Sequence, residues 1–428
     1  MTESTYIRDY LHFLGTAPTP THAAVGVTKR LDQAGFTAVD ETGAWPSEPG
    51  AYYLRRQGAV VAWVVPPSAT ADNIKGFNIF GSHTDSPALK LKPTPQHTTA
   101  DGWGQLDVEI YGAPILNSWL DRELSLAGVV YDHDGNEHLL FSEPVARIPQ
   151  LAIHLDRDVN KGLTLDPQQN LQPVWTVDDP DAQIMDLVAL AAHLPNPDHI
   201  ASYDVILTPT QEPDMFGGLQ DFIAAGRQDN LSSVFAGLFG ILAAAQQPAD
   251  GRISVMAAFD HEEVGSQTAT GAAGPLLTDV LERTGRALGC DAERRAQILA
   301  GSTCVSADAG HSVHPNYPNV SDPQTRPVLG RGPLTKINAN QRYATDAQGI
   351  ALWNRVCAAA GVTTQPFVSN NDIPCGSTIG PIMATRLGIT TVDVGIPLLS
   401  MHSAREMSHR DDCLNLAKAA STYLRADF

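Results

Sequence analysis

The spacing of apolar residues changes along the chain, and each spacing predicts a different kind of element. Near the start, an amphipathic pattern predicts one helix over residues 4–14 and a second helix that begins near Thr21. A hairpin-like pair of strands is expected at residues 52–54 and 60–65, and a buried strand at residues 77–80. The first part of the chain is therefore expected to mix helices with strands.

From about residue 106 to residue 206 the pattern changes to short alternating apolar segments separated by turn residues. Examples are LDVEIYG, LAGVVYD, HLLFSEPV and LAIHL. Alternation of this kind is typical of half-buried strands. We therefore expect a separate, smaller β-rich domain at residues 92–216, inserted between two segments of another domain, residues 1–91 and 217–428.

After Gly217 the pattern again predicts alternating helices and strands. We expect a helix over residues 229–245, strands at 253–259, 298–307 and 390–394, and a closing helix that ends near Leu424. Ser408 with Asp411 resembles a capping box at the start of that last helix, with Asp in place of Glu or Gln. Strands that alternate with helices favour a mostly parallel sheet covered on both faces, so the predicted fold class is α/β.

The composition excludes several classes of partner and location. A chain of 428 residues exceeds the size at which a single hydrophobic core stops growing. Its 28 basic and 47 acidic residues give a net charge of −19, which argues against a nucleic-acid partner. No apolar run is long enough for a membrane span, and the first residues lack the pattern of a secretion signal. Five scattered cysteines suit reduced thiols, so we expect a cytoplasmic protein.

Potential metal ligands come directly after the predicted strands, where α/β sheets place their sites. In chain order the candidates are His83 and Asp85, then Asp229 at the start of a helix, then His261, Glu262 and Glu263, then Asp308, and last His402. Each has a structural explanation when taken alone, since Asp229 could cap its helix and a lone histidine near a strand end is usually structural. Their shared placement favours a metal centre.

Two imidazoles with three or more carboxylates suit a pair of divalent ions such as zinc, manganese or cobalt. The lack of a nearby thiolate argues against a closed structural zinc site. Such a pair acidifies water and polarises a peptide carbonyl, and one further carboxylate must act as a base. Glu262 and Glu263 provide one base and one ligand, because successive side chains on extended backbone point in different directions. An isolated pair of glutamates would more often be a solvated turn.

Six motifs, in order and spanning nearly the whole chain, resemble the M18 family of metallo-aminopeptidases, the aspartyl aminopeptidase group. They are GSHTDSP (81–87), QDNLSSVF (228–235), FDHEEVGSQTATGA (259–272), SADAGHSVHPNYP (306–318), NDIPCGSTIGP (371–381) and MHSAREM (401–407). The resemblance implies an α/β aminopeptidase domain interrupted by a β-rich dimerisation domain, and assembly into hollow tetrahedral dodecamers. Gln228 and Ala309 depart from the family pattern, but neither position holds a ligand.

The resemblance also implies a role for each candidate. Asp229 would bridge two ions, which are completed by His83 and Asp308 on one side and by Glu263 and His402 on the other. Glu262 would be the general base, and Asp85 would hold its neighbouring histidine ligand. His154, in LAIHL, would reach across a dimer and donate to the substrate's carbonyl oxygen, although a histidine in a short apolar strand is more often a packed core residue.

The predicted function is removal of one residue from the N-terminus of a peptide, with two divalent ions per subunit, most simply zinc. A preference for Asp or Glu at that position would need a cation, for which we nominate Lys336, with a surface lysine as the alternative. Arg342 and Arg405 fit an ion-pair role as well as a substrate role. A related carboxypeptidase or deacylase, and a non-catalytic shell or cargo protein, are the competing functions.

Overall fold

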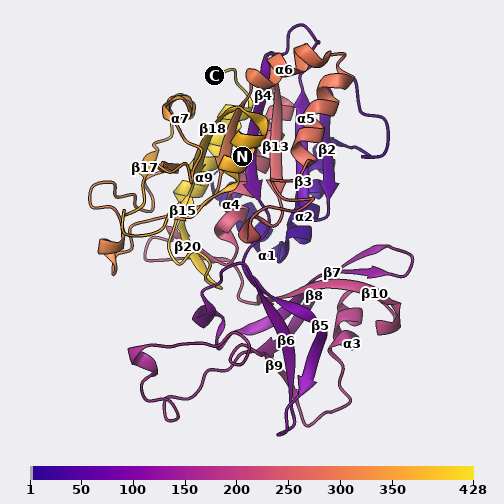
Figure 1. The fold of residues 1–428 in the computed structure, drawn as a ribbon, viewed down its shortest axis with the longest axis vertical. Helices are drawn as coiled ribbons and strands as arrows, with labels where there is room; N and C mark the ends of the chain where they lie inside the picture. The colour runs from indigo at the N-terminus through magenta and orange to yellow at the C-terminus, as the bar shows by residue number, and fades with distance from the viewer. Residues whose placement is uncertain (1–2) are drawn as a thin grey trace.

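The computed structural model describes residues 3–428, which form an α/β unit above a smaller β-barrel in the view of Figure 1. This arrangement confirms the predicted fold class, a mixed and mostly parallel sheet with a separate antiparallel β unit. None of the helices within these residues is long and apolar enough to cross a bilayer. All five cysteines are free thiols.

Within the described residues, nine strands form the sheet of the α/β unit. In spatial order they are β1 (Thr37–Ala38), β2 (Gly50–Arg56), β3 (Ala59–Val65), β13 (Arg252–Phe259), β4 (Gly76–His83), β14 (Thr303–Ala307), β18 (Thr390–Gly395), β16 (Leu334–Lys336) and β17 (Gln365–Phe367). The central strands β13, β4, β14 and β18 are parallel neighbours. Their carboxyl ends therefore meet at one edge of the sheet, which is where the candidate ligands follow.

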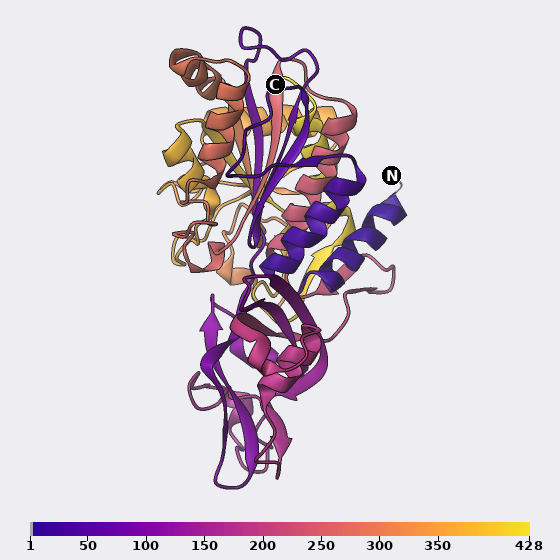
Figure 2. The same ribbon diagram turned by 90° about the vertical axis from the view of Figure 1, so that its right-hand side faces the viewer.

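Helices cover both faces of this sheet, as Figure 2 shows from the side. One face packs against α1 (Glu3–Thr16), α2 (Pro20–Gln33), α4 (Gln228–Gln246), α7 (Ala347–Ala360) and α9 (Arg410–Leu424). The other packs against α5 (Leu276–Ala287), α6 (Ala292–Ala300) and α8 (Ile379–Leu387). Strand β4 is buried along its whole length, with Phe80 in the first core and Phe77 and Ile79 in the second. Burial of each such side chain stabilises the fold by about 1.5–3 kcal/mol.

The middle of the chain closes into an antiparallel barrel. Its strands, in spatial order, are β10 (Ile200–Pro209), β5 (Ala88–Thr98), β6 (Trp103–Tyr111), β9 (Val174–Val177), β8 (Glu137–Arg147) and β7 (Glu123–Asp132). Helix α3 (Ile184–Ala191) packs Ile184 and Val188 into the core of the barrel. Closure pairs the strand edges that an open sheet would expose.

Short strands complete the α/β unit next to the metal-ligand candidates. A small sheet contains β11 (Asp214–Phe216), β12 (Phe222–Ala225) and β20 (Glu406–His409), and a two-stranded pair contains β15 (Gly310–His311) and β19 (Pro397–Leu398). Single 3-10 turns lie at η1 (Leu116–Trp119), η2 (Val159–Lys161), η3 (Pro197–His199), η4 (Glu262–Val264) and η5 (Pro318–Val320).

Two predicted elements differ from the structure for local reasons. The strand expected at 298–307 begins only at Thr303, because Asp291 accepts a hydrogen bond from the Arg294 N–H and starts α6, which continues to Ala300. The last helix is not capped by Ser408. Instead His409 is its N-cap and accepts from the Asp411 N–H.

The segment LAIHL is the third difference, because it forms no strand. It contains a turn in which the N–H of Leu155 donates to the carbonyl of Ala152 at 2.8 Å. Leu151, Ile153 and Leu155 are 60, 45 and 75% exposed, and His154 is also exposed. The interpretation of His154 as a packed core residue is therefore wrong for the single chain.

Candidate metal centre

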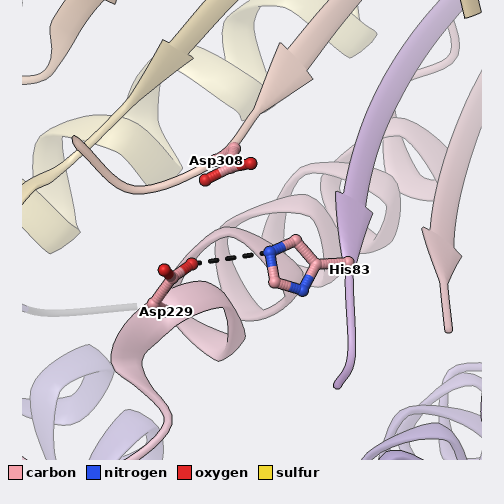
Figure 3. A group of neighbouring side chains, drawn as sticks. All are labelled: His83, Asp229 and Asp308. Atoms are coloured by element: carbon pink, nitrogen blue, oxygen red, sulfur yellow. Dashed lines mark ion pairs between the residues drawn. The ribbon is translucent and has the colours of Figure 1, made fainter. Parts of the chain in front are cut away.

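The carboxyl edge of the central strands brings the five predicted ligands together in two groups. His83, Asp229 and Asp308 form the first group, and their ligand atoms lie within 4.8 Å of one another (Figure 3). Asp229, Glu263 and His402 form the second group, on the same criterion. His83 is the last residue of β4 and Asp308 directly follows β14, so the sheet itself sets their separation.

Asp229 belongs to both groups and directs a different oxygen to each. Its Oδ1 lies 3.4 Å from Nε2 of His83, and its Oδ2 lies 3.3 Å from Nε2 of His402. Asp229 sits in the first turn of α4 with non-helical φ and ψ, and the N-cap position is occupied by Arg227. A helix-capping role does not explain this aspartate.

The charges of the site fit a divalent cation. Within residues 3–428, Oδ1 of Asp229 and Oε1 of Glu263 are buried atoms that have no hydrogen-bond partner. Buried polar atoms nearly always have partners, so each such atom needs an explanation. Burial raises the pKa of Glu262 to about 7 and also raises the pKa values of Glu263 and Asp308, so that these carboxyl groups favour a nearby positive charge. Carboxylates and imidazoles are the ligands that zinc uses in catalytic sites, so the donor set fits the ion.

A fully buried carboxylate, Asp85, lies behind the ligands. Its Oδ1 accepts the N–H of Glu262 and its Oδ2 accepts the N–H of Glu263, each at 3.0 Å. The Nδ1–H of His83 donates to the Asp85 carbonyl at 3.1 Å, and the same nitrogen lies 3.3 Å from Oδ1. With its proton on Nδ1, His83 presents Nε2 as a free ligand atom toward Asp229.

Glu262 differs from its neighbour in what it contacts. It belongs to neither ligand group, yet it lines the same cavity of about 680 Å³ as Asp229, Glu263 and Asp308. The 3-10 turn η4 that carries the two glutamates is flanked by two residues in the left-handed region, His261 at φ 63° before it and Gly265 at φ 98° after it. The predicted division into one ligand and one base is thus compatible with where the two side chains lie, and it stays a prediction.

Lys336, the last residue of β16, lines this cavity and is 1% exposed. Its Nζ lies 3.4 Å from Oδ1 of Asp308 and 5.1 Å from the ring centre of Tyr343. The alternative of a surface lysine is therefore wrong. Arg342 and Arg405 instead donate to backbone carbonyls, at Gly376 in one case and at Gln211 and Glu212 in the other.

His154 is the predicted site residue that the single chain does not bring to the site. Across the part of the chain that the structure describes, His154 is absent from both ligand groups and from the residues that line the cavity. Its role in a neighbouring subunit stays a prediction.

Two residues near the ligands were missed by sequence reasoning. Glu406, 2% exposed, accepts the N–H of Asp229 at 3.0 Å and the N–H of His402 at 2.9 Å. The hydroxyl of Tyr111 donates to Oδ2 of Asp85 at 2.7 Å. Neither has a spacing signature, because Glu406 acts on backbone groups and Tyr111 comes from the barrel.

Comparison with known proteins agrees with this geometry. The chain matches the family described as "Aminopeptidase I zinc metalloprotease (M18)" over residues 13–424. It is 47% identical over 422 residues to the probable M18 family aminopeptidase 2 of Streptomyces coelicolor, and the match covers 97% of each chain.

Solved structures share the fold over almost the whole chain. A chain of the cryo-EM structure of the Ape4 and Nbr1 complex superposes with a TM-score of 0.94 and 33% identity, covering 99% of this chain and 86% of that one. The mApe1 dodecamer of S. cerevisiae superposes with a TM-score of 0.84 and 27% identity, covering 98% and 96%. With a family match across nearly its full length and two groups of side chains that could hold metal ions, the chain belongs to the M18 family of zinc metallo-aminopeptidases.

Proposed function

We propose that this metal-dependent aminopeptidase binds two divalent ions per subunit, with Asp229 shared between them. One observation carries this proposal: the two oxygens of Asp229 face the Nε2 atoms of two different histidines. His83 and Asp308 would complete the site of one ion, and Glu263 and His402 that of the other. Zinc is the proposed ion, and manganese and cobalt are alternatives with the same ligand preferences.

Different residues of the chain transfer the proton and position the groups that react. When bound, the two ions supply Lewis acidity, which acidifies water and polarises the scissile carbonyl. Glu262 accepts a proton from the attacking water on its carboxylate and passes it to the departing amine. Asp85 keeps Glu262 and Glu263 in place through their backbone N–H groups. The metal cavity admits the N-terminal end of a peptide.

Lys336 is our proposed determinant of a preference for acidic N-terminal residues. Its ammonium group is buried in the cavity wall and has Asp308 as its neighbouring anion. Occupation of Asp308 by a metal ion would leave the lysine charge available for a substrate carboxylate. A buried cation without a partner is costly, so an acidic side chain is favoured there.

We further propose that dimers are the smallest active unit and that they assemble into a tetrahedral dodecamer. The S. cerevisiae relative is a dodecamer, and apolar residues 151, 153 and 155 of this chain lie exposed around His154. An exposed apolar cluster is typical of a protein interface. In the partner's site, a ring nitrogen of His154 would donate to the carbonyl oxygen as charge develops, which is worth about 2.7–4 kcal/mol.

The test is a panel of aminoacyl-coumarin substrates with N-terminal Asp, Glu, Ala or Leu. The purified enzyme would be stripped with a chelator and reloaded with zinc, manganese or cobalt, and bound metal would be measured by mass spectrometry. We expect two ions per chain and faster cleavage of the acidic substrates. One ion per chain would refute the dinuclear proposal, and equal rates would refute the preference.

The variant Glu262→Gln tests the proposed base. It should bind metal like the wild type and lose at least about 10²-fold in kcat, because an amide cannot accept the proton. An active variant with normal metal content would remove Glu262 from this role. N-acetylated versions of the same substrates are the control for aminopeptidase action, and they should not be cleaved.

A further inference from the structure

A segment of the inserted barrel contacts the second group of metal-ligand residues and the buried carboxylate Asp85. This segment, residues 111–118, leaves the end of β6 and enters η1. The carbonyl of Ala113 accepts the Nδ1–H of His402 at 3.0 Å, and the N–H of Ile115 donates to the carbonyl of His402 at 2.9 Å. The hydroxyl of Ser118 accepts the N–H of Ala404 at 2.9 Å. The loop that carries His402 is therefore held by residues of the barrel.

The other end of the segment reaches Asp85 through Tyr111. The tyrosine hydroxyl and the N–H of Glu263 both donate to Oδ2 of Asp85, at 2.7 and 3.0 Å. Burial, followed by the charge of Asp85, raises the pKa of Tyr111, so the hydroxyl keeps its proton and remains a donor. A buried carboxylate depends on each of its donors, because water cannot replace a lost one.

The next residue comes close to the second ligand group. Gly112 has φ 70°, and a Cβ placed on it would lie 3.2 Å from Cβ of Glu263 and 3.4 Å from Cα of Pro87. A side chain at position 112 would therefore press on Glu263. The barrel segment therefore packs closely against Glu263 at this position.

We propose that Tyr111 is a positioning residue through which the inserted barrel fixes the metal centre. Its hydrogen bond holds Asp85, and Asp85 holds the backbone of Glu262 and Glu263. This inference rests on the proposed metal centre and adds to it that the barrel, beyond any role in assembly, controls how firmly the ions are retained. Partners behind metal ligands typically contribute a factor of about 10–100 in metal affinity or activity.

The variant Tyr111→Phe removes only the hydroxyl, and Tyr131→Phe is its matched control. The hydroxyl of Tyr131 donates to Oε2 of Glu137 at 3.2 Å, within the barrel. We expect Tyr111→Phe to release zinc to a competing chromophoric chelator about 10–100-fold more readily than the wild type. Its kcat should fall, with KM changed less than about threefold. The control should match the wild type in zinc release, kcat and KM. Gel filtration should show the same oligomer size for the wild type and both variants.

The outcomes separate this inference from the proposed function. Equal zinc retention and kcat in Tyr111→Phe and the wild type would overturn the positioning role alone. A wild-type protein that bound no zinc would overturn the metal centre together with this inference. If Tyr111→Phe does not fold, Gly112→Ala serves instead, because it keeps the hydroxyl and crowds Glu263. Normal zinc retention in Gly112→Ala would then overturn the claim that the barrel segment controls how firmly the ions are retained.

Discussion

Replacement of Lys336 by methionine should abolish the proposed preference for acidic N-terminal residues. The side chain is 1% exposed and lines the metal cavity, and methionine fills a similar volume without charge. In the wild type, the lysine is proposed to pair with the carboxylate of an N-terminal Asp or Glu. The variant would leave that substrate carboxylate buried and unpaired.

The expected magnitude follows from the burial of Lys336. Truncation of one partner of a buried charge pair costs about 2–5 kcal/mol. At about 1.4 kcal/mol per tenfold change, the ratio of kcat/KM for Asp over Ala substrates should fall about 30-fold or more. Lys336 also lies 3.4 Å from Asp308, so the variant can disturb the metal centre. That disturbance affects both substrates alike and cancels in the ratio.

The assay is steady-state hydrolysis of Asp-coumarin and Ala-coumarin by metal-loaded wild type, Lys336→Met and a control, Lys90→Met. Lys90 is also paired with an aspartate, with Nζ 2.8 Å from Oδ2 of Asp204, but it lies outside the metal cavity. The control should keep the wild-type ratio. A ratio that changes less than about threefold in Lys336→Met would refute our reasoning, because the lower limit of the expected cost of losing the charge pair is about 2 kcal/mol.

Three further predictions concern the metals, the assembly and the C-terminus. Asp229→Asn should lose more metal than any other single ligand variant, measured as ions per chain; two ions per chain would contradict a shared ligand. His154→Ala should lower kcat strongly with normal metal and oligomer size, and mixing it with Glu262→Gln should restore part of the activity; no recovery despite proven subunit exchange would rule out action across the dimer. Asp427→Asn should lower the free energy of unfolding by about 1 kcal/mol at pH 7, because two ion pairs at 2.5 Å are lost. The pKa of Asp427 is lowered, first by the hydrogen bond from Lys75, so this stability is present above the ordinary value of 3.8 and is lost as the pH falls through the lowered value. Urea unfolding at pH 7 and at a pH below the lowered pKa of Asp427 checks this, and a difference that persists at the lower pH would contradict it.

The fold and the ligand candidates were largely predictable because one physical rule connects them. Parallel strands end at the same edge of a sheet, so polar residues that follow buried strands gather there. His83 and Asp308 follow this rule directly. The structure groups these residues with Asp229, Glu263 and His402, although their ligation of metal stays a prediction.

The parts that sequence missed act through contacts without a local pattern. Glu406 accepts two backbone N–H groups, and Tyr111 reaches Asp85 from the barrel, so neither contact leaves a spacing in the sequence. The alternation in residues 151–155 predicted a strand, but a strand needs a neighbour to pair with, and in the single chain these side chains face solvent. An alternating apolar pattern of this kind also suits a surface that packs against another molecule.

The insertion of the barrel after β4 has a consequence for synthesis on the ribosome. The barrel strands, from Ala88 to Pro209, pair with one another, so the barrel can close as soon as it has emerged. Strand β4 pairs with β13 and β14, which begin at Arg252 and Thr303. Both edges of β4 therefore stay unpaired until these later strands have been synthesised. An apolar strand with two open edges is prone to aggregate. The nascent chain therefore passes through a stage in which the barrel can be closed while both edges of β4 are still unpaired.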